Sequence, residues 1–144
     1  VDLSAGEPVV LRAGGVSDEL LTRVVGCAVV HRTGGEIAAP GTLVQHYAPL
    51  ATVELVAADE LAGRAAVHAR AGRRVAVLAL RPVPATGDAL VLEPPSDVEE
   101  YARVLYARLR DADREGVDVL LAVPPLPSGI GIAVADRLQR AAAR

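Results

Sequence analysis

The sequence predicts an α/β protein with a layered, mostly parallel sheet and helices on its faces, preceded by a strand–helix segment and a long linker. Two observations predict this class. Residues 73–80 and 117–123 are almost continuously apolar, as in strands that are covered on both faces. Segments with helical periodicity alternate with these runs, and that alternation favours parallel pairing of the strands. The core is expected to consist of Val, Leu, Ile and Ala, because hydrophobic residues make up 51% while Phe, Trp and Met are absent.

Residues 1–27 predict a strand followed by a helix. The apolar run Pro8–Arg12 is closed by glycines, Ser17 is a suitable helix N-cap, and Gly26 fits the end of the helix. A short strand is expected over 27–30. The chain then becomes rich in glycine and proline and loses any sustained period up to residue 50, which predicts a linker or long loop.

Residues 51–144 are expected to form a compact α/β unit. The predicted strands cover 52–56, 73–80, 89–92 and 117–123, and the predicted helices cover 59–71, the stretch from Ser96 to near Gly116, and the residues after Ser128. Ser96 and Glu99 match the capping-box pattern Ser-x-x-Glu. Ser128 is expected to cap the last helix.

Composition excludes several classes of function. The formal net charge is −3, whereas a dedicated nucleic-acid binder usually carries a basic face. No apolar run approaches the ~18 residues that span a bilayer, and no signal-peptide pattern is visible. We therefore expect no membrane partner, no dedicated nucleic-acid binding, and a location in the reducing cytoplasm. The first residue is not Met, so we expect the chain to be a fragment of a longer protein.

The cysteine and two of the histidines carry no metal-site pattern. Cys27 is the single cysteine and is expected to be a small buried apolar residue. His31 and His68 stand far apart, with no carboxylate motif beside them, so no metal ligands are expected.

Two short motifs in the amino-terminal third are candidate binding sites. His46 and Tyr47 stand side by side in a loop bounded by prolines and can present two hydrogen-bonding rings to a ligand. The alternative is a surface loop whose tyrosine packs on the domain. Arg12 ends a strand before two glycines and can clamp a phosphate. The alternative there is a solvated arginine before a turn.

A third motif, Pro127–Gly131, follows a buried strand and precedes a helix, as a dinucleotide-binding turn does. It lacks the third glycine and comes at the last strand, so a helix cap is the favoured interpretation.

Taken in order, the motifs of this chain resemble the C-terminal part of the two-domain threonylcarbamoyl-AMP synthases. The residues that carry the resemblance are Val1–Leu3, Pro8–Gly15, Pro40–Gly41, His46–Pro49, Leu105–Tyr106, Leu109–Arg110, Asp113, Gly129–Ala133, Asp136–Leu138 and Arg140–Ala142. The resemblance implies that residues 1–27 are the tail of a YrdC-like catalytic domain, residues 28–50 a linker across its cleft, and residues 51–144 a C-terminal Rossmann-like domain.

The resemblance also implies a nucleotidyltransferase activity in tRNA modification. Such enzymes condense L-threonine, bicarbonate and ATP, with Mg²⁺, into threonylcarbamoyl-AMP and pyrophosphate, and downstream proteins transfer the threonylcarbamoyl group to tRNA. Arg12 matches the family's phosphate-contacting arginine, and His46 and Tyr47 match the linker motif that closes over the nucleotide. Ala13 and Thr42 depart from the family's usual proline and methionine.

The same resemblance limits what this chain is expected to do alone. It assigns no catalytic residue and no metal ligand to the chain, because the threonine and ATP cleft lies upstream in the family. We therefore expect the fragment alone, without the missing YrdC-like domain, to be inactive and to bind no cofactor tightly. The alternative is a stand-alone Rossmann-like nucleotide-binding or regulatory module without catalysis.

Overall fold

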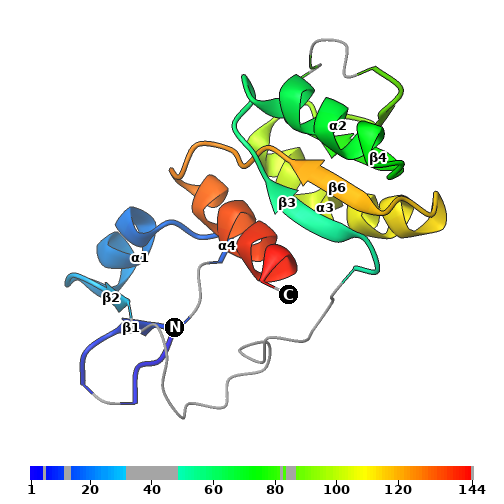
Figure 1. Cartoon of the computed structure of the whole chain (residues 1–144). Helices are drawn as coiled ribbons and strands as arrows, with labels where there is room; N and C mark the ends of the chain where they lie inside the picture. The colour runs from blue at the N-terminus through cyan, green and yellow to red at the C-terminus, as the bar shows by residue number, and fades with distance from the viewer. Residues whose placement is uncertain (5, 12–13, 32–48, 82, 84–86, 144) are drawn as a thin grey trace.

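A computed structural model describes residues 1–144 with the exception of 5, 12–13, 32–48, 82, 84–86 and 144. The described strands form two parallel sheets, one of two strands and one of four (Figure 1). The smaller sheet pairs β1 (Val9–Val10) with β2 (Val30–His31), and helix α1 (Asp18–Val25) connects them. Residues 1–31 therefore make a small β–α–β unit.

The larger sheet has the strand order β3–β6–β4–β5, and every neighbouring pair is parallel. Its strands are β3 (Thr52–Leu55), β4 (Val75–Leu78), β5 (Leu90–Val91) and β6 (Val119–Ala122). The last strand in the chain, β6, thus lies between β3 and β4. The predicted strands are confirmed at the cores of their ranges, and β4 and β6 are buried along their whole length, as their continuous apolar runs predict.

Helices cover both faces of the larger sheet (Figure 1). Helix α2 (Leu61–Arg70) packs on one face through Leu61 and Ala65. Helices α3 (Val98–Arg114) and α4 (Ile130–Ala142) pack on the other. The predicted layered α/β class is confirmed, and the domain boundaries at 27/28 and 50/51 stay predictions.

The N-terminus of α3 corrects the predicted capping box by one residue. Asp97, not Ser96, is the N-cap, and its Oδ1 accepts a hydrogen bond of 2.7 Å from the backbone N–H of Glu100. The backbone N–H and the hydroxyl of Ser96 both donate to Glu100 Oε2 at 2.6 Å. Serine and aspartate are adjacent here, and both are favourable N-cap residues. The capping-box pattern therefore fits with Ser96 and Glu99 as well as with Asp97 and Glu100, and the prediction took the first pair.

The prediction that Ser128 caps α4 is wrong. The N-cap is Gly129, at φ 53°, and no side chain bonds the exposed N–H groups of the first turn. The second glycine of this turn, Gly131, is explained by packing. A Cβ there would collide with the carbonyl oxygen of Leu126 and lie 3.6 Å from Val98 Cγ1. The loop before α4 therefore folds back onto the helix at a position that only glycine fits.

The amino-terminal unit confirms two expectations and corrects one. Ser17 caps α1, and Gly26 ends it at φ 77°. Cys27, however, is exposed, because α1 buries none of its own residues in the described structure and the turn that follows it faces solvent. Across the described residues, no helix is long and apolar enough to cross a membrane.

Candidate functional site

The residues predicted to bind nucleotide, Arg12, His46 and Tyr47, lie outside the described residues. What the structure does describe is how the chain is held on either side of them. The relevant segments are 8–11 and 14–16 around the arginine, and 49–52 after the histidine and tyrosine.

Several hydrogen bonds fix the chain where it enters residues 49–143, the larger sheet with its helices, which we call the larger domain. Pro49 is fully buried, and the backbone N–H groups of Leu50 and Ala51 donate to Asp113 Oδ1 at 2.8 and 3.2 Å. Asp113 stands in the last turn of α3. The next N–H, that of Thr52, donates to the carbonyl of Asp118 at 2.9 Å and starts β3. One carboxylate therefore fixes the end of the predicted linker.

Sequence reasoning missed this role of Asp113, although the aspartate belongs to the motifs that carry the family resemblance. Its partners Leu50 and Ala51 lie 63 and 62 residues before it in the sequence. A lone acidic residue beside a helix's apolar stripe gives no local signal of such a contact.

The segment after Arg12 meets the start of α4. A Cβ placed on Gly15 would lie 3.9 Å from Ile130 Cδ1, an ordinary van der Waals contact. Figure 1 shows the stretch leading into α1 passing beside α4. The flanks of the second and third predicted motifs thus come together, which the sequence did not indicate. The partial positive charge of a helix N-terminus lies on this side of α4.

The third motif itself is explained by packing. Ser128 donates its backbone N–H to Leu126 at 2.8 Å and accepts one from Gly131 at 2.9 Å. Gly131 is required by the close approach of Leu126, and no side chain of this turn forms a hydrogen bond with the described part of the chain. The glycines therefore shape a turn, and the weak dinucleotide interpretation gains no support from its geometry.

Both described histidines have a carboxylate partner that no sequence motif indicated. His31 Nε2 lies 2.6 Å from Asp18 Oδ2, and His68 Nε2 lies 2.8 Å from Glu54 Oε2. The fold supplies these partners from 13 and 14 residues away, beyond the reach of a local motif. Within the described residues, no group of three His, Cys, Asp or Glu side chains could hold a metal ion.

Glu54 connects β3 to α2. Its carboxylate accepts hydrogen bonds from His68 and from Arg64 Nε, the latter at 2.5 Å. Burial disfavours the charged form, but the hydrogen bonds from His68 and Arg64 outweigh it, and the pKa of Glu54 is lowered. The ionised glutamate therefore holds the helix against an edge strand of the sheet.

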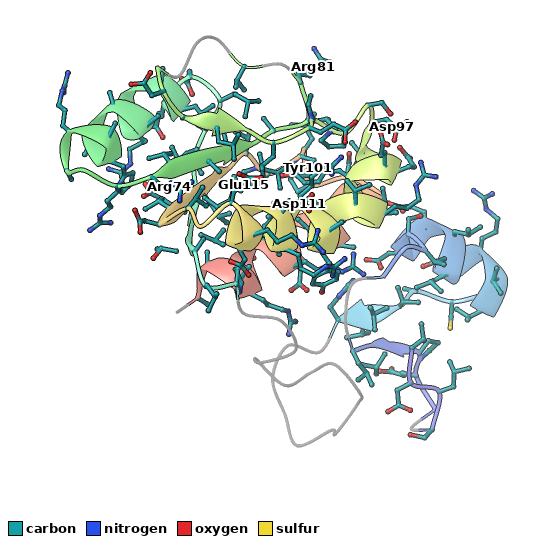
Figure 2. The ribbon with its side chains drawn as sticks, turned by 90° about the vertical axis from the view of Figure 1, so that its right-hand side faces the viewer. Arg74, Arg81, Asp97, Tyr101, Asp111 and Glu115 are labelled. Carbon is teal, nitrogen blue, oxygen red and sulfur yellow. The ribbon has the colours of Figure 1, made fainter. Side chains whose placement is uncertain are left out.

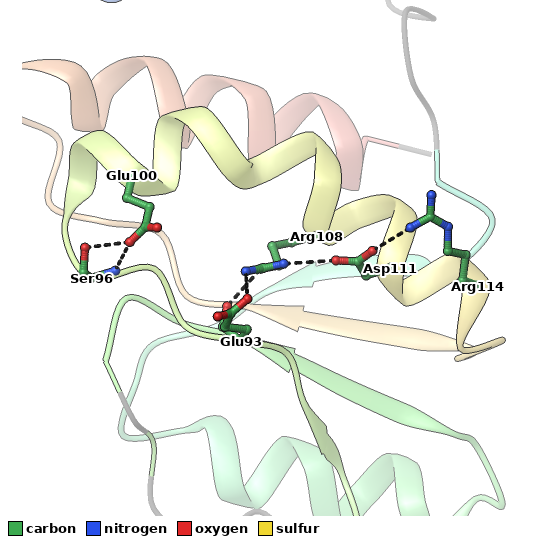
Figure 3. A network of polar contacts seen from close by, with 6 residues as sticks. All are labelled: Glu93, Ser96, Glu100, Arg108, Asp111 and Arg114. Atoms are coloured by element: carbon green, nitrogen blue, oxygen red, sulfur yellow. Dashed lines mark hydrogen bonds and ion pairs between the residues drawn. The ribbon is translucent and has the colours of Figure 1, made fainter.

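A second polar network holds β5 to α3 (Figure 3). Arg108 donates through Nε to the carbonyl of Glu93 at 3.0 Å and also pairs with the Glu93 carboxylate. Its Nη1 donates to Asp111, which in turn accepts from Arg114 at 3.0 Å. Every charge in this network has a partner, so the network serves the fold.

Tyr101 is the buried polar group at the centre of the α3 face (Figure 2). Its hydroxyl donates to the carbonyl of Val123 at 3.3 Å. Burial raises the pKa of Tyr101 above its ordinary value, so the side chain stays neutral and cannot serve as an acid–base group near neutral pH.

The chain is similar in sequence and in structure to known proteins. The family model described as threonylcarbamoyl-AMP synthase, C-terminal domain, matches residues 16–143. A curated threonylcarbamoyl-AMP synthase from Pyrococcus abyssi is 34% identical over 152 residues, which cover 98% of this chain and 44% of that protein. The chain thus spans less than half the length of this relative.

Two solved structures of Sua5 from P. abyssi are similar to this chain. The complex with L-threonine has a TM-score of 0.80 at 34% identity and covers 98% of this chain and 44% of that one. A variant with an adjacent histidine and tyrosine replaced by alanine has a TM-score of 0.83 at 32% identity and covers 98% and 43%. The similarity includes both sheets, because nearly the whole of this chain is covered.

Proposed function

Because the chain belongs to the threonylcarbamoyl-AMP synthase family, matching its C-terminal domain, we propose that it forms the carboxyl-terminal part of an enzyme that makes threonylcarbamoyl-AMP. The substrates would be L-threonine, bicarbonate and ATP, with Mg²⁺, and pyrophosphate would leave. One observation carries the proposal: the match to a synthase runs through the small β–α–β unit as well as the larger domain, over 98% of the chain.

In this proposal the chain contributes to nucleotide binding through residues outside the catalytic cleft. Arg12 would hold the phosphates by bidentate hydrogen bonds, which suit a guanidinium. His46 and Tyr47 would close over the adenylate and keep water from a hydrolysable intermediate. The solved P. abyssi variant changes a neighbouring His–Tyr pair, the same two residue types that this chain carries in sequence.

The described structure supports this division of labour. The carboxyl flank of the His–Tyr motif is fixed by Asp113, and the flank that follows the arginine passes close to Ile130. Both holding residues belong to the larger domain. We propose that this domain is a support that fixes the two nucleotide-binding segments relative to each other, with no catalytic group of its own.

The remaining partners follow from the same proposal. The reaction would take place in the cytoplasm, and downstream threonylcarbamoyl transferase proteins would take the product to tRNA. The chain itself would not contact tRNA, since its net charge is −3.

The test is ATP binding by calorimetry, with Mg²⁺ and L-threonine, on this chain and on a chimera that joins the amino-terminal part of the P. abyssi relative to it. We expect the chimera to bind ATP and the 144-residue chain not to bind it. Arg12→Ala or Tyr47→Ala should weaken ATP binding by the chimera at least tenfold, the loss typical of a charge-assisted contact or a stacked ring. Arg23→Gln, a charge change in the last turn of α1, is the matched control and should bind as the parent does.

A different result would overturn the assignment. ATP binding by this chain alone, insensitive to Arg12→Ala, would favour the stand-alone nucleotide-binding module. A chimera that binds ATP equally well with and without Arg12 would show that the arginine has no role in phosphate binding.

A further inference from the structure

A cavity of about 420 Å³ opens at the amino ends of β4 and β5, away from the two segments discussed above. Its volume falls within the range of ~300–1,000 Å³ typical of small-molecule sites. Residues from the ends of α2 and α3 complete the wall. In Figure 2, Arg74 and Glu115 of this cavity lie toward the opposite end of the sheet from Arg81 and Asp97.

The charged residues that line the cavity are two arginines, Arg73 and Arg74, and two acids, Asp88 and Glu115. None of these four side chains forms a hydrogen bond or an ion pair with any residue that the structure describes. Elsewhere in residues 49–143, Arg64, Arg108 and Arg140 each pair with an acid. Other exposed arginines, such as Arg70 and Arg110, form no ion pair with a described residue, so it is the gathering of both signs of charge around one cavity that distinguishes these four. Opposite charges therefore surround one space without neutralising each other.

The backbone of Arg74 is fixed by hydrogen bonds to the residues that begin β6. Its backbone N–H donates to Asp118 Oδ2 at 2.8 Å, and its carbonyl accepts from the N–H of Asp118 at 2.8 Å and of Val119 at 3.2 Å. Its Nη1 lies 3.1 Å from the point where a side chain on Gly116 would begin. The end of the Arg74 side chain thus lies close to Gly116, which follows Glu115 in the cavity wall.

The acidic side of the cavity suits a cation. Glu115 directly follows the last turn of α3, and Ala69 and Gly72 bring the end of α2 to the wall. Helix C-termini carry partial negative charge, which adds to that of Asp88 and Glu115. The arginines, in turn, suit a carboxylate, which a guanidinium binds with two parallel hydrogen bonds.

We propose that this cavity binds a small zwitterion of the free α-amino-acid class. The ligand carboxylate contacts Arg73 and Arg74, its ammonium group contacts Asp88 and Glu115, and its side chain rests on the apolar wall that includes Val75 and Leu90. A zwitterion satisfies both signs of charge at once, whereas a phosphate would leave the acids opposed to it. This proposal goes beyond the proposed synthase activity and does not rest on it.

The test is a titration of the 144-residue chain with glycine, L-alanine and L-threonine, followed by backbone amide chemical shifts. We expect saturable shifts centred on Gly72, Ala89 and Val117. Acetate and methylammonium, which carry one half of the charge pattern each, should bind at least tenfold more weakly, because each gives up a set of charge-assisted hydrogen bonds.

Two variants and a control complete the experiment. Arg74→Gln and Asp88→Asn should each weaken amino-acid binding at least tenfold while the remaining spectrum stays that of the folded chain. Arg110→Gln, an exposed change on α3 outside the cavity, should have no effect. Binding of acetate as tight as that of glycine, or shifts that ignore both cavity variants, would overturn the proposal. So would the absence of any saturable shift. None of these outcomes depends on ATP binding, so the test is separate from that of the synthase.

Discussion

Replacing Gly131 by alanine should destabilise the protein, whereas the same replacement at Gly63 should stabilise it slightly. Both glycines lie in the first turn of a helix, so alanine brings each a gain of up to about 0.5–1 kcal/mol in helix propensity. At Gly63, a Cβ would have no neighbour within 4 Å. The gain is then the whole effect, at the lower end of that range because first-turn positions are less constrained.

At Gly131 the same gain is opposed by overpacking. A Cβ there would enter the van der Waals radius of the Leu126 carbonyl oxygen and lie 3.4 Å from the Leu126 carbonyl carbon. Backbone must move to make room, and such overpacking costs about 1–3 kcal/mol. Subtracting the propensity gain leaves a net loss of about 0.5–2.5 kcal/mol in the free energy of unfolding.

Urea denaturation followed by far-UV circular dichroism measures both changes at once. The midpoint should fall for Gly131→Ala and rise or stay level for Gly63→Ala, with unchanged slopes. Equal or greater stability of Gly131→Ala would refute the reasoning, because it would mean that the loop before α4 does not press on this position.

Three further predictions concern the polar contacts. Asp113→Ala should speed amide hydrogen exchange at Leu50 and Ala51 at least tenfold, since both N–H groups lose their acceptor; exchange detected by NMR measures this, and unchanged rates would exclude Asp113 as the anchor. The lowered pKa of Glu54 means that its ionised form stabilises the fold above its unfolded pKa of about 4.3 and that this contribution is lost as the pH falls below it, so Glu54→Gln should flatten the acid limb of a stability–pH profile. A parallel profile for both proteins would contradict this. The raised pKa of Tyr101 predicts that its hydroxyl ionises only on unfolding; in a Tyr47→Phe/Tyr106→Phe variant, whose one tyrosine is Tyr101, the tyrosinate absorbance step should coincide with loss of helical signal, and a step within the folded state would oppose its burial.

The elements that could be predicted from sequence are those whose signal is local. The strands β4 and β6 were predictable because burial on both faces makes their residues continuously apolar. The apolar stripe of α3 was predictable because Tyr101, Leu105 and Leu109 recur at helical spacing. The caps were less secure, since Ser96 and Asp97 are both good N-caps and only the backbone geometry selects between them.

The features that escaped prediction depend on contacts between distant parts of the chain. No spacing rule joins Asp113 to Leu50, or His68 to Glu54, because the sheet and not the local sequence brings them together. The same holds for the meeting of Gly15 with Ile130. Of the predicted nucleotide-binding residues, Arg12, His46 and Tyr47 stay predictions, and only the way in which their flanks are held is described.

The strand order has a consequence for the order in which the protein can assemble during synthesis. Among the described strands, β3 pairs with β6 alone, and β4 is joined to β3 only through β6. A ribosome must therefore make residues 119–122 before the first strand of this sheet has any partner. Until then, the backbone N–H and C=O groups of β3, and those on the side of β4 that β6 will cover, remain open to pairing with other chains, a known route to aggregation. The strand that joins β3 to the rest of this sheet is thus the last of its strands to be synthesised.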